Sequence, residues 1–150
     1  DAARGGQGFD VNVTSANGSN YSSMVVGPYS VTQQCVHIFC ATPYGFTWNK
    51  GTFTSITFPG SNGTVATAIN NSGQIVGNYT TVALTPQKSN GFIYNGGTFT
   101  TLNVSGAVLT QPKGINSSGQ VVGYFESPSA QHGFLYSGGT SRTFDHHGAA

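Results

Sequence analysis

The stretch "GINSSGQVVGYF" (residues 114–125) repeats, 46 positions further along, the stretch "AINNSGQIVGNY" (residues 68–79). A more divergent copy, "SNYSSMVVGPY", occupies residues 19–29. In each copy a polar turn that begins with Asn precedes an apolar segment, and in two copies that turn contains Ser-Gly. Turns of this kind between apolar runs predict a β-hairpin, because glycine adopts a positive φ at little steric cost. We therefore expect the first two strands of a repeated unit on either side of the turn.

A second motif follows the first in every copy. It reads "GFTWNKGTFTSITFPGS" from Gly45, "GFIYNGGTFTTLNVSGA" from Gly91 and "GFLYSGGTSRTFDHHGA" from Gly133. The segments "NKG", "NGG" and "SGG" within it predict a second hairpin. Repeats of about 42–50 residues are typical of propellers, solenoids and arrays. We predict an all-β fold of three tandem four-stranded antiparallel units that resemble propeller blades. In the second unit we expect strands near residues 65–70, 74–80, 91–94 and 98–104.

The repeats divide the chain into an N-terminal arm (residues 1–18) and three repeat units (residues 19–60, 61–106 and 107–150). Repeated apolar positions are expected to have structural roles, because apolar and aromatic side chains suit the buried faces of strands. The expected core positions are Ile69 with Ile115, and Val76 with Val122; Phe46, Phe92 and Phe134 share a third repeat position, and Ile56, Leu102 and Phe144 share a fourth.

The composition indicates an ordered protein with few charges. Charged residues make up 6% of the chain, against roughly 25% in an ordinary soluble domain, whereas aromatic residues make up 12%. The basic residues are scattered and the formal net charge is +1, so the sequence lacks the clustered basic footprint of a nucleic-acid-binding protein. No apolar run approaches the roughly 20 residues of a membrane span. The opening "DAARGG" is what we expect of a mature chain after signal-peptide removal.

Both cysteines, Cys35 and Cys40, lie in the segment "CVHIFC" of the first unit. In a secreted protein we expect this pair to form a local disulfide that closes a small loop. A metal site that includes His37 is one alternative, but the segment lacks the Cys-x-x-Cys spacing and a second ligand pair. Two free thiols are the other alternative. We expect a structural disulfide, no metal and no cofactor.

The motifs "GINSSGQVVGYF", "HGFLYSGG" and "GFIYNGGTFTTLNVSGA" resemble the HAF-type extracellular repeats of bacterial secreted proteins. Residues 132–134 keep the His-Gly-Phe form of that motif, whereas Tyr44 and Asn90 stand where the family has histidine. The resemblance covers most of residues 19–149. It implies an extracellular or cell-surface location and propeller-like four-stranded blades, and it carries over no catalytic residue.

Three blades are too few to close a propeller, which usually has four to eight, so we expect the chain to be incomplete as a monomer. The pair Phe9-Asp10 resembles Phe144-Asp145 at the end of a fourth strand. Phe9, Asp10 and Val11 therefore form a candidate assembly arm that adds a strand to another subunit. Two chains in a six-bladed ring and an open filament both fit this expectation. A piece of a longer propeller is the remaining alternative.

The candidate binding residues are Trp48, Tyr94 and Tyr136, which share one repeat position. They form either a shallow carbohydrate site in each unit or packing between units. Glu126 and Asp145 lie in one unit but carry no further mark of a glycosidase pair. In "DHHG" (residues 145–148) the adjacent histidines would point to opposite faces of a strand, which does not favour a metal site.

The sequence favours a secreted, non-enzymatic β-repeat protein that self-assembles as a subunit of an extracellular filament, matrix or surface structure. The alternative is a carbohydrate-binding propeller lectin completed by oligomerisation. The expected partners are further copies of the chain and, in the alternative, carbohydrate. We expect no nucleic acid and no membrane span.

Overall fold

The computed structural model describes residues 10–35, 38–81 and 88–145, except for the side chains of residues 10–13, 32–35 and 38–41. Every helix or strand within these residues is a β-strand, which confirms the all-β prediction. The strands are β1 (Asp10–Thr14), β2 (Gly18–Ser19), β3 (Val25–Cys35), β4 (Ile38–Asn49), β5 (Thr52–Ile56), β6 (Gly63–Ile69), β7 (Ile75–Thr80), β8 (Ser89–Asn95), β9 (Thr98–Leu102), β10 (Leu109–Ile115), β11 (Val121–Glu126), β12 (Gln131–Ser137) and β13 (Thr140–Phe144). The four strands expected in the second unit are β6 to β9, each within two residues of its expected ends.

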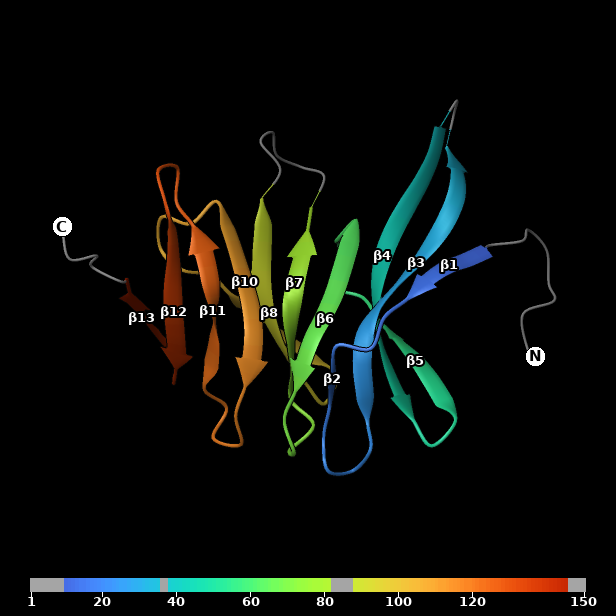
Figure 1. The fold of residues 1–150 in the computed structure, drawn as a ribbon, viewed down its shortest axis with the longest axis horizontal. Coiled ribbons are helices and arrows are strands. Elements are labelled where there is room, and N and C mark those ends of the chain that lie inside the picture. Colours follow the sequence, from blue (N-terminus) through green and yellow to red (C-terminus); the bar gives the residue numbers. More distant parts are fainter. Residues whose placement is uncertain (1–9, 36–37, 82–87, 146–150) are drawn as a thin grey trace.

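The strands pair in two sheets. The first has the order β1–β3–β4–β5, with β2 also pairing with β3, and the second has the order β13–β12–β11–β10–β8–β7–β6, with β9 pairing with β8. All pairs are antiparallel except one parallel contact between Leu109 and Ser89, which joins β10 to β8. This contact makes β6 to β13 one eight-stranded sheet. Figure 1 shows the strands as a row, with β13 at one end and β1, β3 and β4 at the other.

Asparagine holds the repeated turn between the first two strands of each copy. Asn70 Oδ1 accepts hydrogen bonds from the backbone amides of Ser72 and Gln74, at 3.1 and 2.9 Å. Asn20 and Asn116 accept the same two bonds in the other copies. These bonds satisfy backbone donors that the strand ladder cannot reach, so the asparagine of the repeat has a structural role.

The same turn requires a positive φ at the position after its serine. Gly73 and Gly119 adopt φ values of 82° and 76° there, and Ser23 adopts 60° in the first copy. A side chain in this region is crowded by its own backbone, so the first copy forms the turn at a cost of about 1 kcal/mol. The divergent sequence of the first copy therefore keeps the turn geometry without its preferred residue.

A close approach between strands explains the glycine that follows the paired apolar residues in every copy. A Cβ atom on Gly77 would lie 1.9 Å from the carbonyl oxygen of Val65 in β6. Gly27 and Gly123, in β3 and β11, face a carbonyl oxygen in the same way, at 1.8 and 2.1 Å. The approach accompanies a register shift in β6, between Ala66 and Ala68. Glycine is therefore needed where the bulged strand presses against its partner.

Two hydrophobic clusters form the core, and each lies between neighbouring copies of the repeat. The first joins Val26 and Ile56, from β3 and β5, to residues of β6 to β8, namely Ala66, Ile69, Ile75, Tyr79 and Phe92. The second joins Val76, Leu102 and Val104 to Val121, Phe125 and Phe134 of β11 and β12. Because both clusters draw side chains from two copies, the first and second copies bury apolar side chains by stacking on the copy that follows.

Candidate functional site

Large exposed apolar side chains concentrate at the two ends of the row. Trp48 and Phe53, in β4 and β5, are 41% and 49% exposed, and Val122 and Phe144, in β11 and β13, are 45% and 58% exposed. Among the described side chains one further example is Tyr21, which lies in the first asparagine turn. Contiguous exposed apolar surface marks interaction sites in soluble proteins. The two ends of the row are therefore the candidate functional surfaces.

The first of these surfaces, the C-face, is the side of β11 to β13 that points away from β6 to β9, and it carries Val122, Leu135 and Phe144. Val121 and Phe134 are fully buried in the second cluster. Side chains alternate along a strand, so the following residues, Val122 and Leu135, point the opposite way and pair with each other. Phe144 lies on the same side of β13. The C-face thus groups these three apolar side chains with the exposed Arg142, which pairs with Leu135 on the same face.

Val122 was predicted to lie in the core, and the structure shows that this prediction is wrong. Its counterparts Val26 and Val76 are fully buried, because the next copy of the repeat covers them. No described residue covers Val122 in the same way. The same contrast holds at another repeat position, where the exposed fractions are 4% for Ile56, 0% for Leu102 and 58% for Phe144.

A hollow of about 400 Å³ opens on the C-face beside these side chains. Its lining residues are Gln120, Leu135, Ser137, Thr140 and Arg142. Gln74, the counterpart of Gln120, places its side-chain oxygen 3.4 Å from the position of a Cβ on Gly119. The counterpart surface on β7 and β8 is therefore occupied by the turn of the next copy, whereas the hollow on the C-face is open.

The second surface, the N-face, is the side of β3 to β5 that points away from β6 to β9, and it carries Tyr29, Phe46, Trp48 and Phe53. Phe53 stacks on Phe46 with ring centroids 4.8 Å apart and planes at 18°, and its edge contacts Tyr29 at 5.2 Å. Phe46 is only 4% exposed. Phe53 thus covers the aromatic position that residues of the preceding copy cover in β8.

Asparagine side chains form a ladder of hydrogen bonds along the row. Asn20 Nδ2 donates to the backbone carbonyl of Asn70 at 3.1 Å, and Asn70 Nδ2 donates to the carbonyl of Asn116 at 3.0 Å. Each asparagine therefore ties its own turn to the turn of the next copy. Asn116 Nδ2 donates to Gln120 Oε1 at 2.8 Å, and Asn116 itself is exposed. Sequence reasoning did not anticipate this ladder, although the repeated asparagine was its signal.

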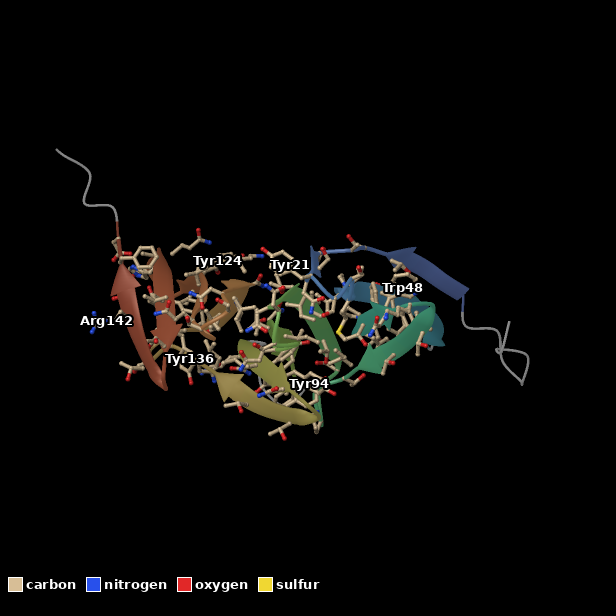
Figure 2. All side chains as sticks on the ribbon, turned by 90° about the horizontal axis from the view of Figure 1, so that it is seen from below. Tyr21, Trp48, Tyr94, Tyr124, Tyr136 and Arg142 are labelled. Atoms are coloured by element: carbon tan, nitrogen blue, oxygen red, sulfur yellow. The ribbon has the colours of Figure 1, made fainter. Side chains whose placement is uncertain are left out.

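The three predicted carbohydrate-binding aromatic residues lie apart. Figure 2 shows Tyr94 and Tyr136 along one side of the row and Trp48 near the end formed by β4 and β5. Tyr94 and Tyr136 are partly buried and pack against the first and second clusters. Their contacts support packing between copies, whereas Trp48 presents an exposed ring on the N-face.

The predicted assembly arm is only partly described. Asp10 and Val11 lie in β1, where their backbones pair with Thr32 and Val31 of the same chain. Phe9 lies outside the described residues. Donation of residues 10–11 to another subunit would first require these pairs to break, so contact between faces is the simpler route to assembly.

The predicted disulfide also falls outside the described part of the structure. The backbone register of β3 and β4 pairs Cys35 with Ile38 and Cys40 with Gln33. The side chains of both cysteines belong to the excepted residues, so the disulfide stays a prediction. His37, named as an alternative metal ligand, lies outside the described residues.

A polar constellation at the C-terminal edge was missed by sequence reasoning, which paired Asp145 with Glu126. His132 Nδ1 lies 2.8 Å from Asp145 Oδ1, and His132 Nε2 lies 3.3 Å from Ser127 Oγ. The order of these groups resembles a Ser-His-Asp triad. However, Ser127 Oγ also lies 3.1 Å from both the carbonyl oxygen and the amide nitrogen of Ala130. These bonds engage the hydroxyl in its own turn, so the contacts support a role in joining the β11–β12 turn to the end of β13.

Within the described residues, no group of three or more His, Cys, Asp or Glu side chains is arranged to hold a metal ion. His146 and His147 lie outside that part of the chain. The described residues also contain no helix long and apolar enough to cross a membrane. Comparisons with protein-family models, with curated proteins and with solved structures find no significant match.

Proposed function

We propose that the chain is a secreted, non-enzymatic β-repeat subunit that self-assembles into an extracellular filament, matrix or surface structure. One observation carries the proposal: Val122 and Phe144 are exposed at repeat positions where the other copies are buried. Full burial of such side chains stabilises a contact by about 1.5–3 kcal/mol each. Because the C-face and the N-face lie at opposite ends of the row, each chain can contact two other chains.

We interpret β1 to β5, β6 to β9 and β10 to β13 as three propeller-like blades; the last two lie within the repeat units at residues 61–106 and 107–150, and the first joins strands of the N-terminal arm to the unit at residues 19–60. The strands from β6 to β9, and those from β10 to β13, pair in sequence order, which supports this division. Thr14 pairs with Tyr29 as Thr64 pairs with Tyr79, so β1 and β2 together take the place of a first strand. The resemblance to HAF-type repeats adds to the interpretation.

The extracellular location rests on that resemblance and on the expected disulfide between Cys35 and Cys40. The low charge of the chain also favours association. Only 6% of its residues are charged, and charged side chains are a main device by which β proteins avoid edge-to-edge contact. The low charge of the surface therefore supports the proposed assembly, because few charged side chains would repel a second chain.

Carbohydrate binding is the second candidate function, and the exposed ring of Trp48 is the observation that favours it. An aromatic ring at the surface can stack on the apolar face of a sugar. A glycan array tests this candidate. A lectin is favoured over a structural subunit if Trp48→Ala abolishes glycan binding and Tyr94→Phe, at a partly buried position, keeps it.

Sedimentation over a wide range of protein concentrations, followed by negative-stain microscopy, tests the assembly proposal. We expect species much heavier than the 15.5 kDa chain, with their proportion rising with concentration. The images decide between a closed ring and an open filament. A monodisperse monomer at every concentration would contradict the proposal.

A further inference from the structure

We propose that the protein assembles head to tail: the C-face of one chain packs on the N-face of another chain, and the asparagine ladder continues across this contact. In this arrangement Asn116 Nδ2 of the first chain donates to the backbone carbonyl of Asn20 in the second chain. The inference rests on the proposed function and specifies which surfaces meet, in which orientation.

The two junctions inside the chain supply the template for this contact. At the first, Val26 and Ile56 pack against Ile75, Tyr79 and Phe92. At the second, their counterparts Val76 and Leu102 pack against the counterpart set Val121, Phe125 and Phe134. At both junctions, therefore, side chains from the same two repeat positions (the inserting positions) pack against side chains from the same three repeat positions (the receiving positions) of the following unit.

The C-face and the N-face are the two halves of a third such junction. Val122 and Phe144 occupy the inserting positions, and they are exposed. The receiving positions on the N-face are Val25, Tyr29 and Phe46, which share the register of Ile75, Tyr79 and Phe92. A second chain is thus the expected partner, because its N-face presents the counterparts of the residues that Val26 with Ile56, and Val76 with Leu102, contact within one chain.

The aromatic rings of the N-face adopt an arrangement that an arriving copy would change. At the internal junction Phe99 meets Phe92 edge-on, with centroids 5.5 Å apart and planes at 68°. On the N-face the counterpart Phe53 lies almost flat on Phe46, with planes at 18°. We infer that the ring of Phe53 turns edge-on to Phe46 when Phe144 of another chain contacts Phe46.

The hydrogen bond proposed between the two chains has a free donor hydrogen on Asn116 Nδ2 and a free lone pair on the carbonyl oxygen of Asn20. Asn116 Nδ2 carries two hydrogens, and one of them bonds Gln120 Oε1. The carbonyl oxygen of Asn20 accepts one bond, from the amide of Ser23, and has a second lone pair. Within the chain the carbonyl of Asn70 accepts two bonds, from Gly73 and from Asn20. The added rung would give Asn20 that same pattern.

The inserting and receiving surfaces differ, so the contact is heterologous and gives every assembly a direction. A contact between two C-faces would bring inserting positions against each other and would offer Asn116 no turn carbonyl in the repeat geometry. Back-to-back dimers are therefore not expected. Rings and filaments use the same junction and differ only in whether its rotation closes.

Two variants that each block one face provide the test. Val122→Asp places a charge on the C-face and leaves the N-face intact, whereas Phe53→Asp blocks the N-face and leaves the C-face intact. Burying an unpaired charge is strongly unfavourable, so each variant alone should associate at least about 100-fold more weakly than the unchanged chain. An equal mixture should form a heterodimer of twice the 15.5 kDa chain mass and stop there, because one junction of intact faces is available.

Controls keep the test decisive. Ser105→Lys changes an exposed residue in the turn between β9 and β10, which belongs to neither face, so it should assemble like the unchanged chain. Circular dichroism checks that both blocked variants fold. If Phe53→Asp does not fold, Trp48→Asp replaces it, because Trp48 is 41% exposed on the same face. Asn116→Asp removes the donor of the rung and should weaken association about tenfold.

Each outcome bears on a different claim. Assembly of the unchanged chain together with the mixed heterodimer supports the head-to-tail junction. Full assembly of either blocked variant alone, or a folded mixture that stays monomeric while the unchanged chain assembles, overturns the junction and leaves the assembly function standing. If the unchanged chain stays monomeric at all concentrations, the proposed function fails as well.

Discussion

Changing Asn70 to aspartate tests how much the asparagine ladder contributes to the stability of the fold. Aspartate keeps an acceptor oxygen for the backbone amides of Ser72 and Gln74, so the turn itself retains its two bonds. It removes the Nδ2 donor that reaches Gln74 Oε1 at 2.7 Å and the carbonyl of Asn116 at 3.0 Å. The Gln74 amide can rotate to donate instead, but the backbone carbonyl of Asn116 cannot.

The expected cost has two parts. The carbonyl of Asn116 keeps its bond from the amide of Gly119 but loses the bond from Asn70, and a hydrogen bond of this kind contributes about 1 kcal/mol. Asn70 is 4% exposed, so the carboxylate that replaces its amide is buried facing that carbonyl, and a buried polar group without its full set of partners costs about 1–3 kcal/mol more. We therefore expect Asn70→Asp to lower the free energy of unfolding by about 2–4 kcal/mol relative to the matched variant Asn116→Asp. That variant has the same contacts within its turn but no rung to lose within the described chain.

Urea unfolding followed by circular dichroism measures this difference. Both variants should carry Val122→Asp in addition, so that association does not contribute to the measured stability. Asn20→Asp should resemble Asn70→Asp, because Asn20 Nδ2 donates to the carbonyl of Asn70 at 3.1 Å. If Asn70→Asp and Asn116→Asp agree to within about 0.5 kcal/mol, less than the value of one hydrogen bond, the ladder is not a stabilising feature and the reasoning is refuted.

Three further predictions concern the turn, the bulge and the cysteines. Ser23→Gly should raise the free energy of unfolding by about 0.5–1 kcal/mol in urea titrations, because the residue adopts a φ of 60°; an unchanged or lower value would argue against strain at this turn. Gly77→Ala should lower the thermal unfolding midpoint sharply, or prevent folding, because its Cβ would lie 1.9 Å from the carbonyl oxygen of Val65; a fully stable variant would contradict the close approach. Thiol titration of the denatured, unreduced protein should find no free thiol if Cys35 and Cys40 are joined, and two free thiols would rule out the disulfide.

The hairpins were predictable from sequence because the chemistry of their turns is local. An asparagine that bonds its own turn, and a glycine that accepts a positive φ, act over four or five residues. Copies of these residues recur along the chain, so strand positions in the second unit could be predicted to within two residues. The parallel contact between Leu109 and Ser89 was not predictable, because it joins two copies through backbone atoms alone.

The candidate site was only partly predictable for the same reason. Its aromatic residue Trp48 was identified from its repeat position, and assembly was expected from the number of units. The faces themselves were not identified, since Val76 and Val122 stand in nearly the same sequence context and differ only in what covers them. The contact between His132 and Asp145 was also missed, because it depends on the register of β12 and β13.

The sequence by itself determined an all-β chain of repeated hairpins, with turns held by asparagine and glycine, because those preferences are written within each copy. The tertiary structure alone decided which repeated apolar residues are buried. Burial of Val26 and Val76 depends on the following copy, which stacks on them, and the same residue type at Val122 faces outward. The three copies have similar sequences, but no further copy within the described chain covers the last one, so its apolar side chains are exposed.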